Sequence, residues 1–93
     1  MRGAAVITRQ QVRMARAALG WSVQALAAKA GVAGNTVSRY ENGTDAYGET
    51  LMKLERALEA GGVTFIAEDQ EGGPGVRLKK KRVKRPAAEK IRR

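Results

Sequence analysis

Apolar residues recur at helical spacing through the first two thirds of the 93-residue chain, with glycines between the runs. The first run begins at Thr8, whose hydroxyl can cap a helix while the Gln11 side chain reaches back to it, an arrangement called a capping box. The apolar stripe that follows consists of Val12, Ala15 and Leu19. Gly20 fits the left-handed turn that ends a helix, so the pattern predicts a first helix between Thr8 and Gly20.

Two shorter helices are predicted to follow and to cross closely. Ser22 can cap the first of them, which runs to about Ala30, and Gly31 fits a tight turn with positive φ. The second runs from roughly Gly34 to Asn42. The apolar side of the pair consists of Leu26, Ala30, Val32, Val37 and Tyr40, with the small Ala27 at the crossing. This pattern favours a helix-turn-helix over the alternative of an ordinary helical hairpin in a small bundle.

A fourth helix is predicted from about Thr50 to Ala60, after which two glycines break the pattern. Its core-facing residues are Leu51, Leu54 and Leu58. The β-branched and aromatic run Val63–Ala67 then predicts a strand, and Val76–Leu78 a short return strand. We therefore expect a helical domain, a β extension and a basic tail that is disordered in isolation. Their ranges are residues 1–61, 62–78 and 79–93.

Three stretches of the chain resemble the Cro/cI (XRE) family of helix-turn-helix regulators. They are Leu19 to Ala27, Ala30 to Val32 and Thr36 to Gly43, and the string from Ser38 to Gly43 is the most specific. The resemblance covers about Thr8 to Ala60 and implies a mainly α, four-helix, lambda-repressor-like domain. It also implies that the third helix lies in the major groove of double-stranded DNA. More loosely, the ending formed by 62–66 and 73–78 is similar to that of anti-CRISPR-associated small repressors.

The net charge of +9 is concentrated at one end of the chain. Ten of the 18 basic residues, but only one of the nine acids, lie between Arg77 and Arg93. Residues 77–93 therefore carry the whole excess, almost all of it in the tail, and the rest of the chain is neutral. Such a tail is typical of basic arms that bind nucleic acid without reading its sequence, and the alternative is a solvated terminus that aids solubility.

The outer face of the third predicted helix carries the candidate base-reading residues, which are Asn35, Thr36, Ser38 and Arg39. Arg39 has the planar fork that bonds guanine through two hydrogen bonds. Its alternatives are a phosphate contact or an ion pair within the helix. Asn35 suits adenine and equally suits a helix cap.

Phosphate contacts orient a protein on DNA without reading sequence. The start of the second predicted helix offers free backbone amides and a favourable dipole for an anion. The candidates at this helix start, after the third helix and in the tail are Ser22, Gln24, Asn42, Thr44, Tyr47, Lys79, Lys80, Lys81 and Arg82. Ordinary capping or solvent exposure is the alternative for each residue outside the tail.

The resemblance further implies a structural ion pair between Arg16 and Glu41, at positions where the family often has a buried arginine and glutamate. Removing one partner of such a pair costs more than the pair contributes net. The chain also departs from the family at Val23, where a phosphate-contacting glutamine is common, and has acids at Asp45 and Glu49 in a loop that is often basic. We therefore expect the body to bind DNA weakly by charge alone.

A homodimer is expected because a two-stranded hairpin is barely stable alone and leaves an unpaired edge. The predicted dimer interface is the strand formed by Val63, Thr64, Phe65, Ile66 and Ala67. The alternative is that this strand packs only on its own domain.

These features favour a cytoplasmic, nucleoid-associated transcription regulator, most simply a dimeric autorepressor of bacterial or phage type that reads a pseudopalindromic operator. An antitoxin with a toxin or other protein antagonist as partner, and a non-specific architectural DNA-binding protein, are the competing classes. No enzyme, cofactor or metal site is expected, because the chain has no cysteine or histidine and no carboxylate pair in a recognisable motif. No apolar stretch is long enough for a membrane span.

Overall fold

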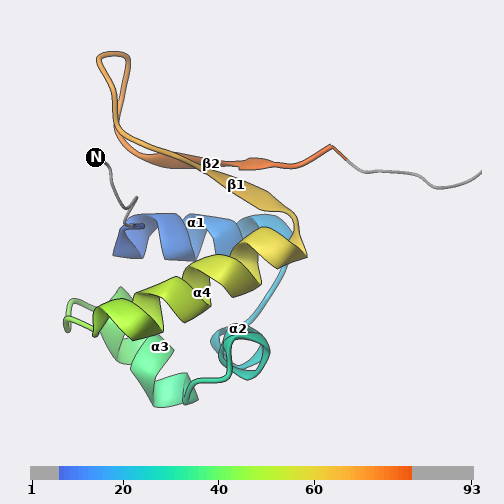
Figure 1. Ribbon diagram of the computed structural model, residues 1–93, viewed down its shortest axis with the longest axis vertical. Helices are drawn as coiled ribbons and strands as arrows, with labels where there is room; N and C mark the ends of the chain where they lie inside the picture. The colour runs from blue at the N-terminus through green and yellow to red at the C-terminus, as the bar shows by residue number, and fades with distance from the viewer. Residues whose placement is uncertain (1–6, 81–93) are drawn as a thin grey trace, which may run out of the picture.

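The computed structural model describes residues 7–80, and the predicted contacts of Lys81 and Arg82 lie outside this part of the chain. Four helices are followed by a β-hairpin (Figure 1). Their bounds are α1 Arg9–Leu19, α2 Val23–Ala30, α3 Gly34–Glu41, α4 Gly48–Gly61, β1 Val63–Ile66 and β2 Gly75–Leu78. The predicted fold class, a helix-turn-helix domain with a short β-hairpin, is confirmed. None of the helices in residues 7–80 is long and apolar enough to cross a membrane.

Caps and glycines set the helix boundaries close to where the sequence predicts them. The hydroxyl of Thr8 accepts from the backbone N–H of Gln11 (3.1 Å), and the N–H of Thr8 donates to the Gln11 side chain (2.9 Å). The hydroxyl of Ser22 accepts from the N–H of Ala25 (3.0 Å) at the start of α2. Gly31 ends α2 with φ at 75°, a backbone conformation that is cheap only for glycine. These local signals explain why the prediction of α1 and α2 succeeds.

The core lies where all four helices and the hairpin meet. Its fully buried side chains come from every helix and from β1. The largest of them are Leu26, Leu54, Leu58, Val12, Val37 and Val63. The predicted Ala30, Val32 and Leu51 are half-buried at the edge of this core. α3 packs on α1 and α2, while the hairpin packs on α1 and α4 on the opposite side of the domain (Figure 1).

The hairpin is tied to the helical domain by a buried glutamine. The Gln11 amide nitrogen donates to the carbonyls of Ile66 (3.0 Å) and Gly75 (2.9 Å), which close the end of the two strands. Gln11 is only 3% exposed, so these bonds are shielded from water. One side chain therefore caps α1 through its oxygen and fixes the hairpin through its nitrogen.

This packing corrects one premise of the predicted dimer. The hairpin is not isolated, because its inner face rests on α1 and α4 of its own chain. The Val63 side chain is fully buried in that core, so it cannot contribute to an interface with a second chain. Only the backbone of Val63 is left for that purpose, whereas Thr64, Ile66 and Ala67 are exposed.

Replacing Gln11 by glutamate should destabilise the protein by about 1–3 kcal/mol, because a carboxylate cannot donate to the two buried carbonyls. Urea unfolding followed by the fluorescence of Trp21, the single tryptophan, measures the change. The matched control is Gln10→Glu, one residue earlier and exposed, which should be neutral or slightly stabilising at the start of a helix. Equal stability of the Gln11→Glu and Gln10→Glu variants would contradict the anchoring role.

Candidate nucleic-acid interface

The outer face of α3 presents polar side chains that point away from the domain. Asn35 and Arg39 are exposed, and Thr36 and Ser38 are half-buried beside them. No side-chain hydrogen bond or ion pair occupies Asn35 or Arg39 within residues 7–80. An ion pair within α3, the structural alternative for Arg39, is therefore not formed.

The start of α3 is not capped by Asn35, although capping was one of the two roles that the sequence suggested for this residue. Its N-cap residue is Ala33, which offers no side-chain hydrogen bond, and Gly34 is the first residue of the helix. Asn35 thus lies inside the helix and does not cap it, so the capping interpretation is wrong. Its amide is free to meet a ligand at the exposed end of α3, where backbone N–H groups also lack a side-chain cap.

Ser22 and Gln24, the candidates at the start of α2, are both exposed. The Ser22 hydroxyl oxygen caps α2 by accepting from Ala25, which leaves its O–H hydrogen and the remaining first-turn amides free to donate to an anion. The Gln24 side chain lies over the start of α3, because a Cβ added to Gly34 would come within 2.6 Å of its Oε1. Gly34 therefore permits the close approach that brings the start of α2 beside the start of α3.

Asn42, Thr44 and Tyr47 lie beyond the other end of α3. Asn42 donates from its side chain to the Ser38 carbonyl (2.9 Å), so it satisfies the end of the helix. Tyr47 is 85% exposed and precedes α4 without capping it by its side chain. A shallow hollow between α3 and the following loop is lined by Thr36, Arg39, Thr44, Tyr47 and four neighbours. The structure thus brings Thr44 and Tyr47 together with Thr36 and Arg39, whereas Asn42 does not line this hollow.

A two-pronged ion pair holds the end of α3 against α1. Arg16 donates from Nε to Glu41 Oε2 (2.7 Å) and from Nη2 to Oε1 (2.8 Å). Its third nitrogen donates to the carbonyl of Trp21 (3.1 Å), which leads into α2. Glu41 is 5% exposed, and its hydrogen bonds raise the pKa of Arg16 above the ordinary value. Arg16 therefore links α1, the α1–α2 turn and α3.

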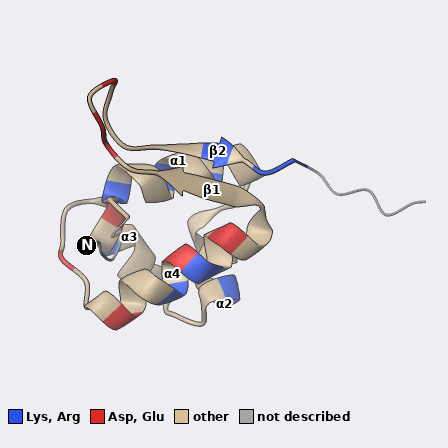
Figure 2. Cartoon of the chain, turned by 45° about the horizontal axis from the view of Figure 1, so that its top comes forward, with Lys and Arg blue, Asp and Glu red and all other residues tan. Residues whose placement is uncertain are grey.

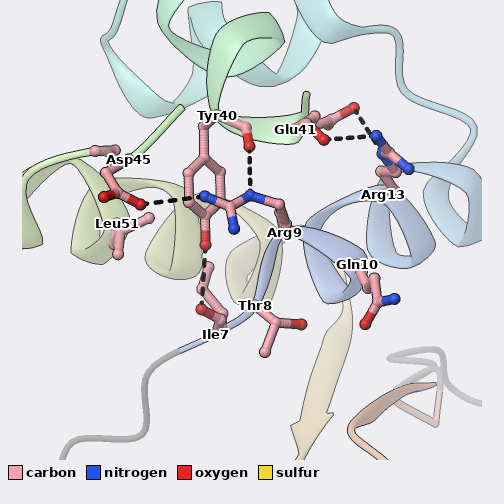
Figure 3. A pocket seen from close by; sticks show the side chains of 10 residues that line it. Ile7, Thr8, Arg9, Gln10, Arg13, Tyr40, Glu41, Asp45 and Leu51 are labelled. Carbon is pink, nitrogen blue, oxygen red and sulfur yellow. Dashed lines mark hydrogen bonds and ion pairs between the residues drawn. The ribbon is translucent and has the colours of Figure 1, made fainter. Parts of the chain in front are cut away.

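Two further arginines of α1 contact the same end of α3, and neither contact was predicted from the sequence (Figure 3). Arg9 donates to the carbonyl of Tyr40 (2.8 Å) and lies over the Tyr40 ring, 4.9 Å from its centre. Arg13 donates to the carbonyl of Glu41. Cations beside the last carbonyls of a helix are favourable, because that end carries a partial negative charge. The spacing of Arg9, Arg13 and Arg16 on one helix face is the signal that could have revealed them.

Tyr40 completes the contact between α3 and α1. Its ring is buried, and its hydroxyl donates to the carbonyl of Ile7 (3.3 Å). Burial raises the pKa of the Tyr40 hydroxyl, and the nearby Arg9 partly opposes this rise. The neutral phenol is thus the form that the fold favours. These contacts hold α3 along its inner side, while Asn35 and Arg39 on its outer side stay exposed.

Comparison with known families agrees with this geometry. The Helix-turn-helix family model matches residues 12–61, more than half of the chain. The chain belongs to the Cro/cI (XRE) type of helix-turn-helix proteins. A comparison with curated proteins finds no significant match. The family match ends at the last residue of α4, so this XRE protein carries its hairpin outside the matched region.

Removing one partner of the Arg16–Glu41 pair should lower the free energy of unfolding more than removing both partners. We expect Arg16→Met to destabilise this XRE domain by about 3–5 kcal/mol, because it leaves the buried Glu41 carboxylate poorly paired. The double variant Arg16→Met/Glu41→Leu should recover part of that loss in urea unfolding. Arg13→Met, which removes a half-exposed neighbour, is the control and should cost about 1 kcal/mol or less. Glu41→Leu is also measured alone. A double variant that loses as much unfolding free energy as Arg16→Met and Glu41→Leu lose together would contradict this expectation.

Proposed function

We propose that this protein is a sequence-specific transcription regulator that acts as a dimeric repressor. Membership of the XRE family supports DNA binding and transcription regulation as the general role. The observation that carries the specific proposal is the division of α3 into two sides. Its inner side is fixed by Arg16, Tyr40 and the core, and its outer side presents polar groups without internal partners.

The outer residues fit the major groove in chemistry and position. Arg39, one turn into the helix, has the fork that bonds guanine O6 and N7. Asn35, at the exposed start, has the amide that bonds adenine N6 and N7. Thr36 and Ser38 are short, so the helix can approach the bases closely. We assign base reading to these four residues.

Phosphate binding falls to residues on both sides of α3. We assign it to Ser22 and Gln24 at the start of α2, and to Asn42, Thr44 and Tyr47 beyond α3. All five are exposed. A helix placed between two sets of phosphate contacts is held at a fixed depth and register in the groove.

A homodimer joined through the hairpin supplies the second recognition helix. The hairpin lies across the domain from α3, so a partner there does not compete with DNA (Figure 1). A twofold dimer reads an operator with inverted half-sites about one helical turn apart, or a multiple of it. Binding over a promoter would then block transcription.

Replacing Arg39 by alanine should relax base preference at one position in each half-site. The loss of a two-bonded guanine contact is worth about 1–3 kcal/mol, or roughly 5- to 150-fold in affinity for the preferred base pair. Fluorescence anisotropy with DNA from upstream of the gene, its single-base variants and a scrambled duplex measures this.

The control for that experiment is Arg56→Ala, which removes the same charge from the exposed side of α4. Arg56→Ala should lower the affinity only slightly, and by the same factor for every duplex. If Arg39→Ala weakens binding to all sequences by the same factor, Arg39 contacts only phosphate and the base-reading assignment is wrong.

The basic tail should add affinity and salt dependence without adding sequence preference. If about six of its charges neutralise phosphates, the slope of log K against log salt should be steeper by about 5 in the full chain. The comparison is with a chain that ends at Lys80, which keeps the bond from the Lys79 N–H to the Gly62 carbonyl. Loss of all preference for upstream DNA in both chains would favour a non-specific architectural protein.

A further inference from the structure

Each strand of the hairpin leaves its outer edge unpaired, and the hydrogen-bond pattern shows which groups the β1 edge offers. β1 and β2 pair antiparallel, with Thr64 opposite Arg77. The backbone N–H of Lys79 donates to the carbonyl of Gly62 (2.8 Å), which makes these two a hydrogen-bonded pair. Because such pairs alternate along an antiparallel ladder, the backbone groups of Val63 and Phe65 point away from β2.

The two outer edges of the hairpin differ in how they are protected. β2 follows Pro74 and carries Arg77, and Lys79 and Lys80 come directly after it. Proline and charged side chains are the usual devices that prevent a strand edge from pairing with another chain. The β1 run, residues 63–67, has neither a charge nor a proline. β1 is therefore the edge without protection.

The charges at the two ends of the hairpin are opposite in sign (Figure 2). Glu68, Asp69 and Glu71 lie at the turn end, whereas Arg77, Lys79 and Lys80 lie at the open end. Lys79 reaches across the open end, where its ammonium donates to the carbonyl of Glu59 (3.0 Å) at the end of α4. Its charge thus lies on the β1 side of the hairpin.

We propose that a second copy of this chain pairs with the β1 edge, antiparallel and centred on Phe65. In this register Val63 faces Ala67 of the second copy, and Thr64 faces Ile66 of the second copy. Glu68 faces Gly62 of the second copy, which lies beside Lys79 of that same copy. The acidic end of each hairpin then meets the basic end of the other, twice in the dimer. The two hairpins become one four-stranded sheet, and exposed Ile66 is covered.

This pairing rests on the proposed homodimer and specifies its surface and register. It uses only the backbone of Val63, in agreement with the burial of that side chain. The outward-facing positions Thr64, Ile66 and Arg77 can each be changed without disturbing the core, since all three are exposed. The chain contains no cysteine, so an introduced cysteine reacts without background.

The test mixes full-length Thr64→Cys and Ile66→Cys proteins under mild oxidation and separates the products on a non-reducing gel. We expect a cross-linked dimer in the mixture and little in either protein alone, because each position faces the other one across the dyad. Arg77→Cys is the control on β2, directly across the hairpin from Thr64. The Arg77→Cys protein should form no cross-linked dimer on the gel.

Three results would overturn the pairing. Cross-linking of Arg77→Cys alone would indicate a dimer joined through β2. Cross-linking of Thr64→Cys alone would indicate a different register. The third result is the absence of a cross-link in every sample. Charge reversal is the second measurement, and sedimentation reports self-association. Glu68→Lys should weaken self-association, and the double variant Glu68→Lys/Lys79→Glu should restore it. Failure of the restoration also contradicts the proposal.

DNA binding by the same variants separates this proposal from the proposed function. A chain that prefers upstream DNA over scrambled DNA but forms no 64–66 cross-link overturns the strand pairing and leaves the regulator role intact. A chain that cross-links as expected but shows no preference for any upstream sequence supports the pairing and overturns the regulator role.

Discussion

The two-pronged bond between Arg16 and Glu41 is the interaction on which the arrangement of the helices depends. It joins the end of α3 to the last turn of α1, and through the Trp21 carbonyl it also fixes the entry to α2. Glu41 is almost fully buried, so its carboxylate has little contact with water. Burying this charge is unfavourable unless the Arg16 guanidinium is paired with it. The proposed role of α3, to lie in a groove of DNA at a defined angle, needs this kind of support.

The molecule is organised as two faces on opposite sides of one core. The α3 face carries polar groups without internal partners, and the hairpin face carries backbone groups without partners on β1. A polar side chain of α1 anchors each face from within: the half-buried Arg16 bonds to Glu41 of α3, and the buried Gln11 bonds to the hairpin. One helix therefore fixes the relative position of the proposed DNA-reading surface and the proposed dimer surface.

The sequence predicts the local elements well because caps, glycines and apolar spacing act over a few residues. Thr8, Ser22 and Gly31 place the ends of α1 and α2 almost to the residue. The sequence does not predict that Gln11 reaches Gly75, 64 residues away, since that contact depends on how the hairpin lies across α1. For the same reason the sequence left open whether Val63 packs on its own domain or against a second chain, and the structure buries its side chain in the core.

The account stands on the claim that α3 reads base sequence, and selection from a random pool of duplexes tests it most directly. Full-length protein is used to retain bound duplexes over several rounds, and the recovered DNA is sequenced. The account predicts enrichment of a motif with two inverted half-sites about one helical turn apart, or a multiple of it. Recovery of a pool with the same composition as the starting DNA would contradict it.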